Sequence, residues 1–257
     1  MEKKDYIEIT NLLKKKAKKK YLIFIPAYNV EKTIYKLFCD IPKKIFKVYK
    51  VDIIIINDLS SDQTNYELIK IKKKFNYKII ILNNKEKLNY GGVQKKAFNY
   101  SIKKKYDYVI MLHGDGQYSP KKLPNFLKLL ATDKYDAVFG TRMFSYYSAL
   151  SGGMPLYKLI GNICLTKVQN FILNTKISEF HSGYRSYKIK SLKKINFNKL
   201  TNQFHFDTEI IIKFLLKKFS IKEIPIPTIY GEQVSHLKSI PYGLNILKVM
   251  FRYIIQN

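Results

Sequence analysis

The stretch DYVIMLHGDGQYSP, residues 107–120, decides the fold class that this chain should adopt. Its first half, residues 108–112, is a short apolar run, typical of a strand that is buried on both faces. Its second half is rich in glycine and polar residues and ends at Pro120, where regular structure should stop. Asp115 therefore stands between two glycines just after a buried strand, at the edge where open α/β sheets usually bind ligands.

Asp115 and Gln117 carry oxygen atoms of the kind that bind a hard cation such as Mg²⁺ or Mn²⁺. The alternative for this stretch alone is an ordinary strand-to-loop turn with a solvated aspartate. The other strand ends decide between the two interpretations.

Polar residues follow two earlier apolar runs in the same way. Residues 21–26 (YLIFIP) predict a first buried strand that ends at Tyr28 and Asn29, and residues 51–56 (VDIIII) predict a second that ends at Asn57 and Asp58. Helices are expected at about 31–40, 62–75 and 89–105, with further strands at 77–82 and 107–112. This alternation predicts right-handed βαβ units and a mostly parallel sheet, so the polar clusters should meet at one rim.

The second half of the chain has a less regular pattern. Helices are expected at 122–130, 156–173 and 204–218, a strand at 135–140 and an extended edge segment at 224–227. Residues 177–185 (ISEFHSGYR) hold polar and charged side chains too densely for a core segment. Residues 241–257 predict an amphipathic helix of either core-packing or interfacial type. We expect one main domain over residues 21–240, after a basic lead-in at 1–20 and before this terminal helix.

Composition restricts the class of protein further. The formal charge is +28, from 47 Lys and Arg against 19 Asp and Glu, which permits nucleic acid, acidic lipid or phosphorylated substrates as partners. No nucleic-acid-binding motif accompanies the charge, so no nucleic acid partner is expected. The only cysteines, Cys39 and Cys164, lie far apart, which suits a reducing compartment. No signal peptide or run of about 20 apolar residues is present, so we expect a cytoplasmic protein, soluble or peripherally membrane-bound.

Eight segments, taken in order, resemble the family 2 glycosyltransferases of GT-A fold, and especially their polyprenyl-phosphate branch, similar to dolichol-phosphate mannose synthase. The segments are IPAYNVEKTI, IIINDLSSDQT, NYGGVQKKA, MLHGDGQYSP, FGTRM, GGMPLYKLIGN, ISEFHSGYRSYK and FHFDTEIIIK. Each is weak alone, but their order and spacing over residues 21–240 make the resemblance specific. It implies a Rossmann-like, mostly parallel sheet flanked by helices, and transfer of a sugar from a nucleotide-sugar donor.

The resemblance also implies roles on the donor side. Pro26, Ala27 and Tyr28 would line the nucleotide pocket, and Asp58 would accept a hydrogen bond from a base N–H. Gly114 and Asp115 would contact the nucleotide sugar.

A metal site is implied in the same place. Asp115 and Gln117 would hold Mg²⁺ or Mn²⁺, which neutralises the donor diphosphate. His113 stands where the family usually has aspartate, and it would ligate the metal or contact the donor instead.

On the acceptor side, Arg142, Ser182 and Arg185 would bind the acceptor phosphate or the donor diphosphate. Arg142, Arg185 and Asp115 would thereby take part in catalysis. Glu179 occupies the position of an acid that the family carries before its SGxR motif. A hydroxyl acceptor would need a general base, for which Glu179, Asp207 and Glu209 are the candidates; a phosphate acceptor would need none.

Several positions depart from the branch. Asn57 replaces the first of two usual acids, Val30 replaces a glutamate, and Thr228 and Val234 replace basic residues. The donor could therefore be a UDP- or a GDP-sugar.

The function expected from the sequence is inverting, metal-dependent transfer of a hexose to a lipid phosphate at the inner face of an anionic membrane. One alternative is transfer to a hydroxyl of a lipid-linked glycan or of a cell-surface polysaccharide precursor. Another is a catalytically inactive GT-A module that binds an anionic partner.

Overall fold

The computed structural model describes residues 19–231 and 239–256. Most of the basic lead-in expected at 1–20 lies outside the described residues, and so do Val234 and Asn257.

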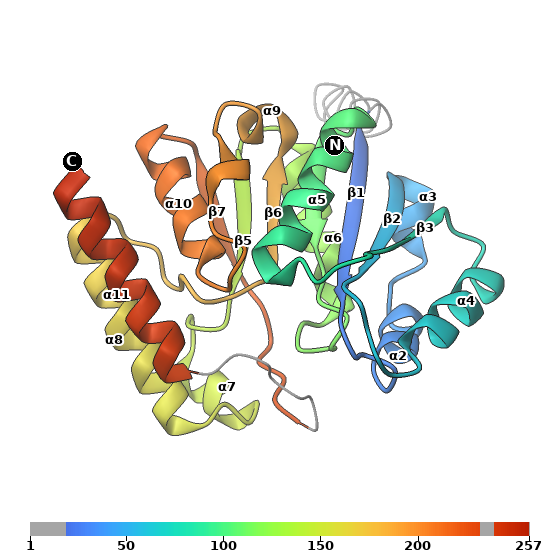
Figure 1. Ribbon diagram of the computed structural model, residues 1–257, viewed down its shortest axis with the longest axis horizontal. Coiled ribbons are helices and arrows are strands. Elements are labelled where there is room, and N and C mark those ends of the chain that lie inside the picture. The colour runs from blue at the N-terminus through green and yellow to red at the C-terminus, as the bar shows by residue number, and fades with distance from the viewer. Residues whose placement is uncertain (1–18, 232–238, 257) are drawn as a thin grey trace, which may run out of the picture.

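A seven-stranded sheet in the order β3-β2-β1-β4-β6-β5-β7 forms the centre of the protein (Figure 1). The strands are β1 (Lys20–Ala27), β2 (Lys50–Asn57), β3 (Ile79–Asn83), β4 (Tyr108–Met111), β5 (Ala137–Thr141), β6 (Arg185–Lys188) and β7 (Ile221–Pro225). β6 runs antiparallel to β4 and β5, whereas the other pairs are parallel. The mostly parallel α/β sheet expected from the sequence is confirmed, with β3 and β7 as its edge strands.

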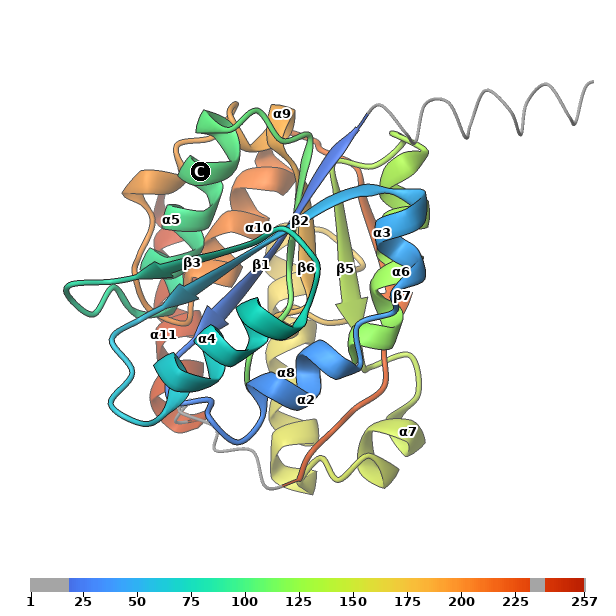
Figure 2. The same ribbon diagram turned by 90° about the vertical axis from the view of Figure 1, so that its right-hand side faces the viewer.

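Helices cover both faces of the sheet (Figure 2). They are α2 (Ile34–Cys39), α3 (Lys44–Val48), α4 (Thr64–Lys74), α5 (Asn89–Lys103), α6 (Leu123–Ala131), α7 (Tyr146–Ser151), α8 (Leu156–Leu173), α9 (Ile189–Leu192), α10 (Phe206–Leu216) and α11 (Ser239–Gln256), with short 3₁₀ turns at Pro120–Lys122 and Phe197–Lys199.

Side chains alternate between two cores, as the period of a β-strand requires. Ile23 and Ile25 of β1 pack with α2, α3, α4 and α6, whereas Leu22 and Phe24 pack with α5, α9 and α10. Because the sheet is covered on both faces, its central strands are continuous apolar runs rather than alternating ones. That is why the sequence showed β1, β2 and β4 clearly.

The segment before and within β6 contradicts the expectation that residues 177–185 are too polar for the core. Glu179, Ser182 and Arg185 are all at most 1% exposed. Glu179 and Arg185 are buried with polar partners from distant parts of the chain, described below, and Ser182 with its neighbour Arg185. The polarity of residues 177–185 therefore does not indicate that this segment is exposed.

The C-terminal helix α11 is present, as expected, and packs along α8 at one end of the protein (Figure 1). Its buried face is formed by Ile246, Val249 and Met250. These side chains pack against Ile212 of α10. Among the described residues, no helix is long and apolar enough to cross a membrane.

Candidate active site

A cavity of about 750 Å³ opens at the carboxyl ends of β1, β2 and β4. Tyr28, Asp58 and Asp115, one from each predicted polar cluster, line it. Two backbone hydrogen bonds hold the three loops together, from Asp58 N–H to the Ala27 carbonyl (2.9 Å) and from Gly114 N–H to the Pro26 carbonyl (3.2 Å). The expected convergence of the strand ends is therefore present.

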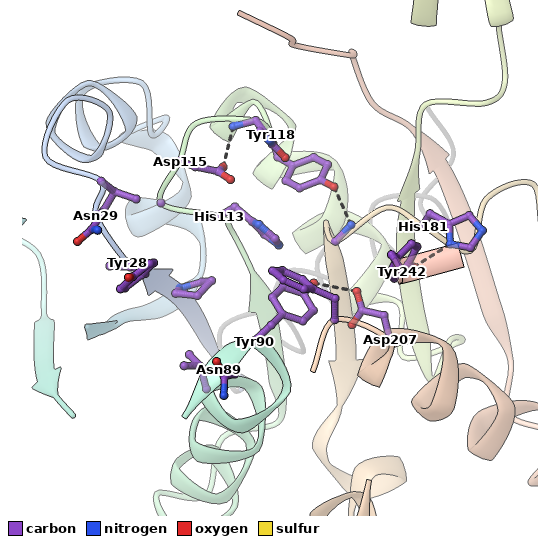
Figure 3. Close-up of a pocket in the computed structure, with 18 of the residues that line it drawn as sticks. Tyr28, Asn29, Asn89, Tyr90, His113, Asp115, Tyr118, His181, Asp207 and Tyr242 are labelled. Atoms are coloured by element: carbon purple, nitrogen blue, oxygen red, sulfur yellow. Dashed lines mark hydrogen bonds between the residues drawn. The ribbon is translucent and has the colours of Figure 1, made fainter. Parts of the chain in front are cut away.

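One end of the cavity is built from Pro26 and Ala27, the last residues of β1, and from Tyr28, which follows them. The Lys87 ammonium lies 3.6 Å from the centroid of the Tyr28 ring, so a cation covers one face of this aromatic side chain. Figure 3 shows Tyr28 and Asn89 at this end of the cavity, across from Tyr242 and His181.

Asp58 anchors the loop that leads into α5. Its carboxylate accepts hydrogen bonds from the backbone N–H groups of Leu88 (2.8 Å) and Asn89 (2.9 Å) and from the Asn84 amide (2.7 Å). A carboxylate has about four lone-pair sites, so capacity for a further donor remains. Asp58 lies where a base contact was expected, and it also supports the start of α5.

The departure at Asn57 has a structural reason. Its amide nitrogen donates to the side-chain oxygens of Asn65 (2.8 Å) and Asn83 (3.1 Å), while its own oxygen accepts from Ser60. An aspartate could not donate these two bonds. Asn57 is therefore a neutral connector between the loops, at 2% exposure.

The loop after β4 carries the candidate metal donors. Asp115 and Gln117 both line the cavity, and the Gln117 backbone N–H donates to Asp115 Oδ1 at 3.0 Å (Figure 3). Gly114 is required by packing, since a Cβ there would lie 2.8 Å from the Pro26 carbonyl oxygen. In the described parts of the chain, no group of three or more His, Cys, Asp or Glu side chains could hold a metal. The two oxygen donors nevertheless suit Mg²⁺ or Mn²⁺, which commonly takes one or two carboxylates and completes its shell with substrate phosphates and water.

His113 lines the cavity, and one edge of its ring faces the loop before β6. A Cβ on Gly183 would lie only 2.4 Å from His113 Nε2, so this edge of the ring faces Gly183. Nε2 is buried without a hydrogen-bond partner of good geometry in the described structure. Burial lowers the pKa of His113, which keeps the imidazole neutral. Asp115 and Gln117 supply the oxygen donors of the loop, and the role of His113 as a metal ligand or donor contact stays a prediction.

Arg142, which follows β5, lines the cavity from the other side. Glu179, fully buried, accepts hydrogen bonds from Arg142 Nε (2.9 Å), from Nη2, and from the Arg142 backbone N–H (2.7 Å). Burial alone would raise the pKa of Glu179, but the ion pair with Arg142 outweighs it and lowers the pKa. Glu179 is thus held as a carboxylate outside the cavity lining, which does not fit the expected role of general base.

Arg185 and Ser182 do not reach the cavity, contrary to the expectation that they bind phosphate. The Arg185 side chain is 1% exposed and donates to the backbone carbonyls of Ser182 (2.6 Å), Asp207 (3.1 Å) and Phe180. Its Nε lies 3.9 Å from the Asp207 carboxylate. Arg185 therefore holds the loop before β6 against α10 from beneath the site.

Asp207 is the carboxylate that the structure does bring to the cavity wall at this end. It accepts a hydrogen bond from the Tyr90 hydroxyl at 2.8 Å (Figure 3) and another from the Gln94 amide at 2.9 Å, both donors being on α5. Glu209, the other candidate on α10, accepts from the Thr201 backbone N–H at 2.7 Å and is absent from the cavity lining.

Two further contributions to the cavity were not found in the sequence. Lys158, in the first turn of α8, lines the cavity with its ammonium 5.1 Å from the centroid of the Tyr230 ring. Tyr242 of α11 contacts His181 Nδ1 through its hydroxyl at 2.8 Å, and both line the cavity. Burial lowers the pKa of His181 to about 3, so this imidazole is neutral. An amphipathic-helix pattern predicts that α8 and α11 exist, but not which turn faces a cavity.

A ligand cavity at the carboxyl edge of a mostly parallel sheet is typical of nucleotide-binding α/β proteins. The chain matches the family model "Glycosyl transferase family 2" over residues 22–196, and it belongs to this family.

Two relatives extend the similarity over most of the chain. A UDP-N-acetylglucosamine–dolichyl-phosphate N-acetylglucosaminyltransferase of Methanococcus voltae is 24% identical over 91% of this chain and 94% of its own length. A polyprenol monophosphomannose synthase of Mycolicibacterium smegmatis is 22% identical over 90% of this chain and 84% of its own. Among solved structures, glucosyl-3-phosphoglycerate synthase from Mycobacterium tuberculosis, in complex with Mn²⁺, UDP and phosphoglyceric acid, superposes with a TM-score of 0.65 at 14% identity. That match covers 96% of this chain and 80% of the other, and it establishes the GT-A fold.

Proposed function

We propose that this glycosyltransferase moves a hexose from a nucleotide-sugar donor, a UDP- or GDP-sugar, to the phosphate of a polyprenyl-type lipid. The observation that carries the proposal is the pair of cations on the side of the cavity opposite Tyr28. Arg142 and Lys158 both line the cavity there. The names of the two relatives, which act on dolichyl phosphate or form a polyprenol monophosphomannose, support a lipid phosphate as acceptor.

Arg142 is oriented for this role by its buried partner. Glu179 engages Nε and Nη2, and the His181 carbonyl accepts from Nη2 at 3.3 Å. No hydrogen bond within the described structure engages Nη1. One edge of a fixed guanidinium therefore remains for an anion, which is the geometry that suits phosphate oxygens.

The proposed reaction is a direct displacement with inversion. An acceptor phosphate oxygen, already ionised at neutral pH, forms a bond to the anomeric carbon, while the bond from that carbon to the donor diphosphate breaks. The nucleoside diphosphate leaves with the bonding electrons, so no proton has to be removed from the acceptor. When bound by Asp115 and Gln117, Mg²⁺ or Mn²⁺ supplies charge neutralisation for the diphosphate. The M. tuberculosis protein carries Mn²⁺ together with UDP, which supports this cofactor by analogy.

Transfer to a hydroxyl is a second candidate function, favoured by one specific observation. Asp207 presents a carboxylate to the cavity, and a hydroxyl acceptor needs a base within hydrogen-bond reach. In the phosphate reaction, the same carboxylate would instead accept hydrogen bonds from sugar hydroxyls.

A direct assay tests the proposal. The protein is incubated with a panel of UDP- and GDP-sugars and a short-chain polyprenyl phosphate, with Mn²⁺, with Mg²⁺ or with EDTA. Mass spectrometry should detect a sugar phosphodiester. NMR should show that the anomeric configuration of the product is inverted relative to the donor. EDTA should abolish formation of the product. Transfer to hydroxyl acceptors alone would replace the proposal by the second candidate. Tight nucleotide binding with no transfer to either acceptor would indicate an inactive module.

We place the reaction at the inner, cytoplasmic face of a membrane because a polyprenyl lipid is the acceptor.

A further inference from the structure

Helix α8 exposes large apolar side chains while several of its polar side chains are buried. Its inward face is mixed: Leu159, Asn162, Thr166 and Gln169 are all at most 8% exposed. Apolar side chains point outward instead: Leu156 is 61% exposed, Tyr157 65%, Ile160 53%, Val168 39% and Phe171 89%. A helix of a soluble domain normally buries the apolar stripe and exposes the polar one. Because α8, 18 residues or about 27 Å long, exposes an apolar stripe along most of its length, its outward face fits an apolar environment.

Helix α11 extends this surface. It packs against α8 and α10 through Ile246, Val249 and Met250, and its other side is again apolar. The exposed residues of that side are Ile240, Leu244, Leu247, Phe251, Ile254 and Ile255, at 45–80% exposure. Helix α7 packs next to α8 and adds Tyr146, Tyr147 and Leu150. The three helices occupy one end of the protein (Figure 1). An exposed apolar surface of this extent marks an interaction site.

The charges on this surface select the partner. Residues 137–178 and 239–256 contain no aspartate or glutamate, although the whole chain has 19. They contain Lys158 and Lys167 on α8 and Lys248 and Arg252 on α11. A second copy of the chain would bring the same positive charges together, whereas an anionic bilayer offers both an apolar layer and negative headgroups. Basic and apolar residues without acidic ones are the composition of helices that lie in a membrane interface.

We propose that α7, α8 and α11 form a membrane-binding surface, with α8 and α11 lying in the interface of an anionic bilayer. This inference rests on the proposed lipid acceptor and specifies how the acceptor reaches the site. Tyr157 and Ser239, in the first turns of α8 and α11, both line the cavity. The two helices therefore begin at the cavity, and a lipid phosphate enters there from the bilayer, next to Lys158. The membrane contact is thus a surface of three helices rather than the terminal helix alone.

The chain contains no tryptophan, which permits a specific fluorescence test. Phe171→Trp places a single reporter on the outward face of α8. Ile69→Trp is the matched control, since Ile69 is 55% exposed on α4, a helix outside the proposed surface. With phosphatidylglycerol-containing vesicles, the emission of Phe171→Trp should shift to the blue and be quenched by brominated lipid. Neither change is expected for Ile69→Trp, or for Phe171→Trp with phosphatidylcholine vesicles at physiological salt.

A second pair of variants measures affinity. The double substitution Ile160→Ser and Phe171→Ser should lower co-sedimentation with anionic vesicles at least tenfold, while Ile69→Ser should leave it unchanged. Circular dichroism melts should remain close to the original for all of them, because these side chains are exposed. The inference is overturned if Phe171→Trp stays solvated in every vesicle. It is also overturned if light scattering shows a dimer that the double substitution dissociates, since a second copy would then cover the surface.

Failure of this inference and failure of the proposed function are separable. Transfer to a short-chain phosphate in solution without vesicle binding would leave the function standing and remove the membrane surface. Vesicle binding without any transfer to a lipid phosphate would do the reverse.

Discussion

Arg142 and Glu179 form a buried ion pair in which Glu179 orients the guanidinium, and the guanidinium lines the active-site cavity. The two residues lie 37 positions apart, one after β5 and the other in the segment before β6. The pair explains why a carboxylate that resembles a catalytic acid in the sequence is not exposed to substrate. It also makes the two residues separable by experiment.

Replacing Glu179 by Gln should destabilise the fold by about 3–5 kcal/mol, because Arg142 would keep its charge in a buried position without a counter-ion. Urea denaturation followed by circular dichroism measures this loss. Arg142→Lys should instead leave UDP affinity close to the original and raise the KM for a phosphate acceptor at least tenfold, since an ammonium lacks the forked geometry. A Glu179→Gln protein of normal stability with no transfer would restore Glu179 as the catalytic base.

The same pair predicts a pH dependence of stability. The pKa of Glu179 is lowered in the folded protein, so its contribution is fully present above its ordinary unfolded pKa of about 4.3 and is lost as the pH falls through the folded pKa. The difference in unfolding free energy between the original protein and Glu179→Gln should therefore be constant at pH 6–8 and shrink in more acidic buffers.

Asp115→Asn should remove the Mn²⁺-dependent part of UDP binding, because the amide keeps the size of the side chain but not the charge that the cation needs. Calorimetric titration of UDP with and without Mn²⁺ measures this independently of turnover. Asp62→Asn is the matched control. Asp62 lines the same cavity, but its carboxylate accepts backbone hydrogen bonds from Glu31 and Thr64. Equal metal dependence in both variants would remove Asp115 from the metal site.

Asp58→Ala should weaken UDP binding by about 1–3 kcal/mol, the range for leaving a buried donor unsatisfied. Because Asp58 also anchors the loop before α5, Asn84→Ala serves as the comparison. It removes one hydrogen bond to the same carboxylate from a residue outside the cavity lining. If both variants lose the same affinity, Asp58 acts through the loop and not through the base.

The parallel half of the sheet could be predicted because its information is local. The apolar runs at 21–26, 51–56 and 108–112 are buried on both faces, and the polar residues at their ends need no distant partner to be recognised. Asp58 and Asp115 were found for that reason.

The antiparallel strand β6 and the acceptor side could not be predicted in this way. The sequence predicts that Arg185 binds phosphate. In the structure its guanidinium instead donates to backbone carbonyls and forms an ion pair with Asp207 of α10. Lys158 looks like an ordinary surface lysine, but α8 turns it into the cavity. Whether a charged residue lies in the core or in a site depends on its contacts with residues far along the chain. A single sequence does not show which of these residues come into contact.

Asp207→Asn separates the two acceptor classes. If the acceptor is a phosphate, transfer should persist within about tenfold, because no proton is removed. If the acceptor is a hydroxyl, loss of a general base should reduce kcat by roughly 10²–10⁴-fold and flatten the acidic limb of the pH profile. Glu209→Gln is the control on the same helix, since Glu209 lies outside the cavity lining. A large loss in Asp207→Asn with phosphate as the verified acceptor would contradict the proposed mechanism.

Removing residues 241–257 should abolish transfer even with a short-chain acceptor in solution. The structure supplies the reason: Tyr242 is part of the cavity wall, and Ile246 and Met250 are buried against α8 and α10. Tyr242→Phe isolates the first contribution, because it deletes only the hydroxyl that contacts His181 at 2.8 Å. This variant should raise the acceptor KM severalfold and leave UDP affinity and the melting temperature unchanged, whereas Tyr253→Phe, farther along α11, should change neither kinetic quantity. A truncated chain that melts normally and transfers at full rate in solution would show that α11 serves the membrane alone.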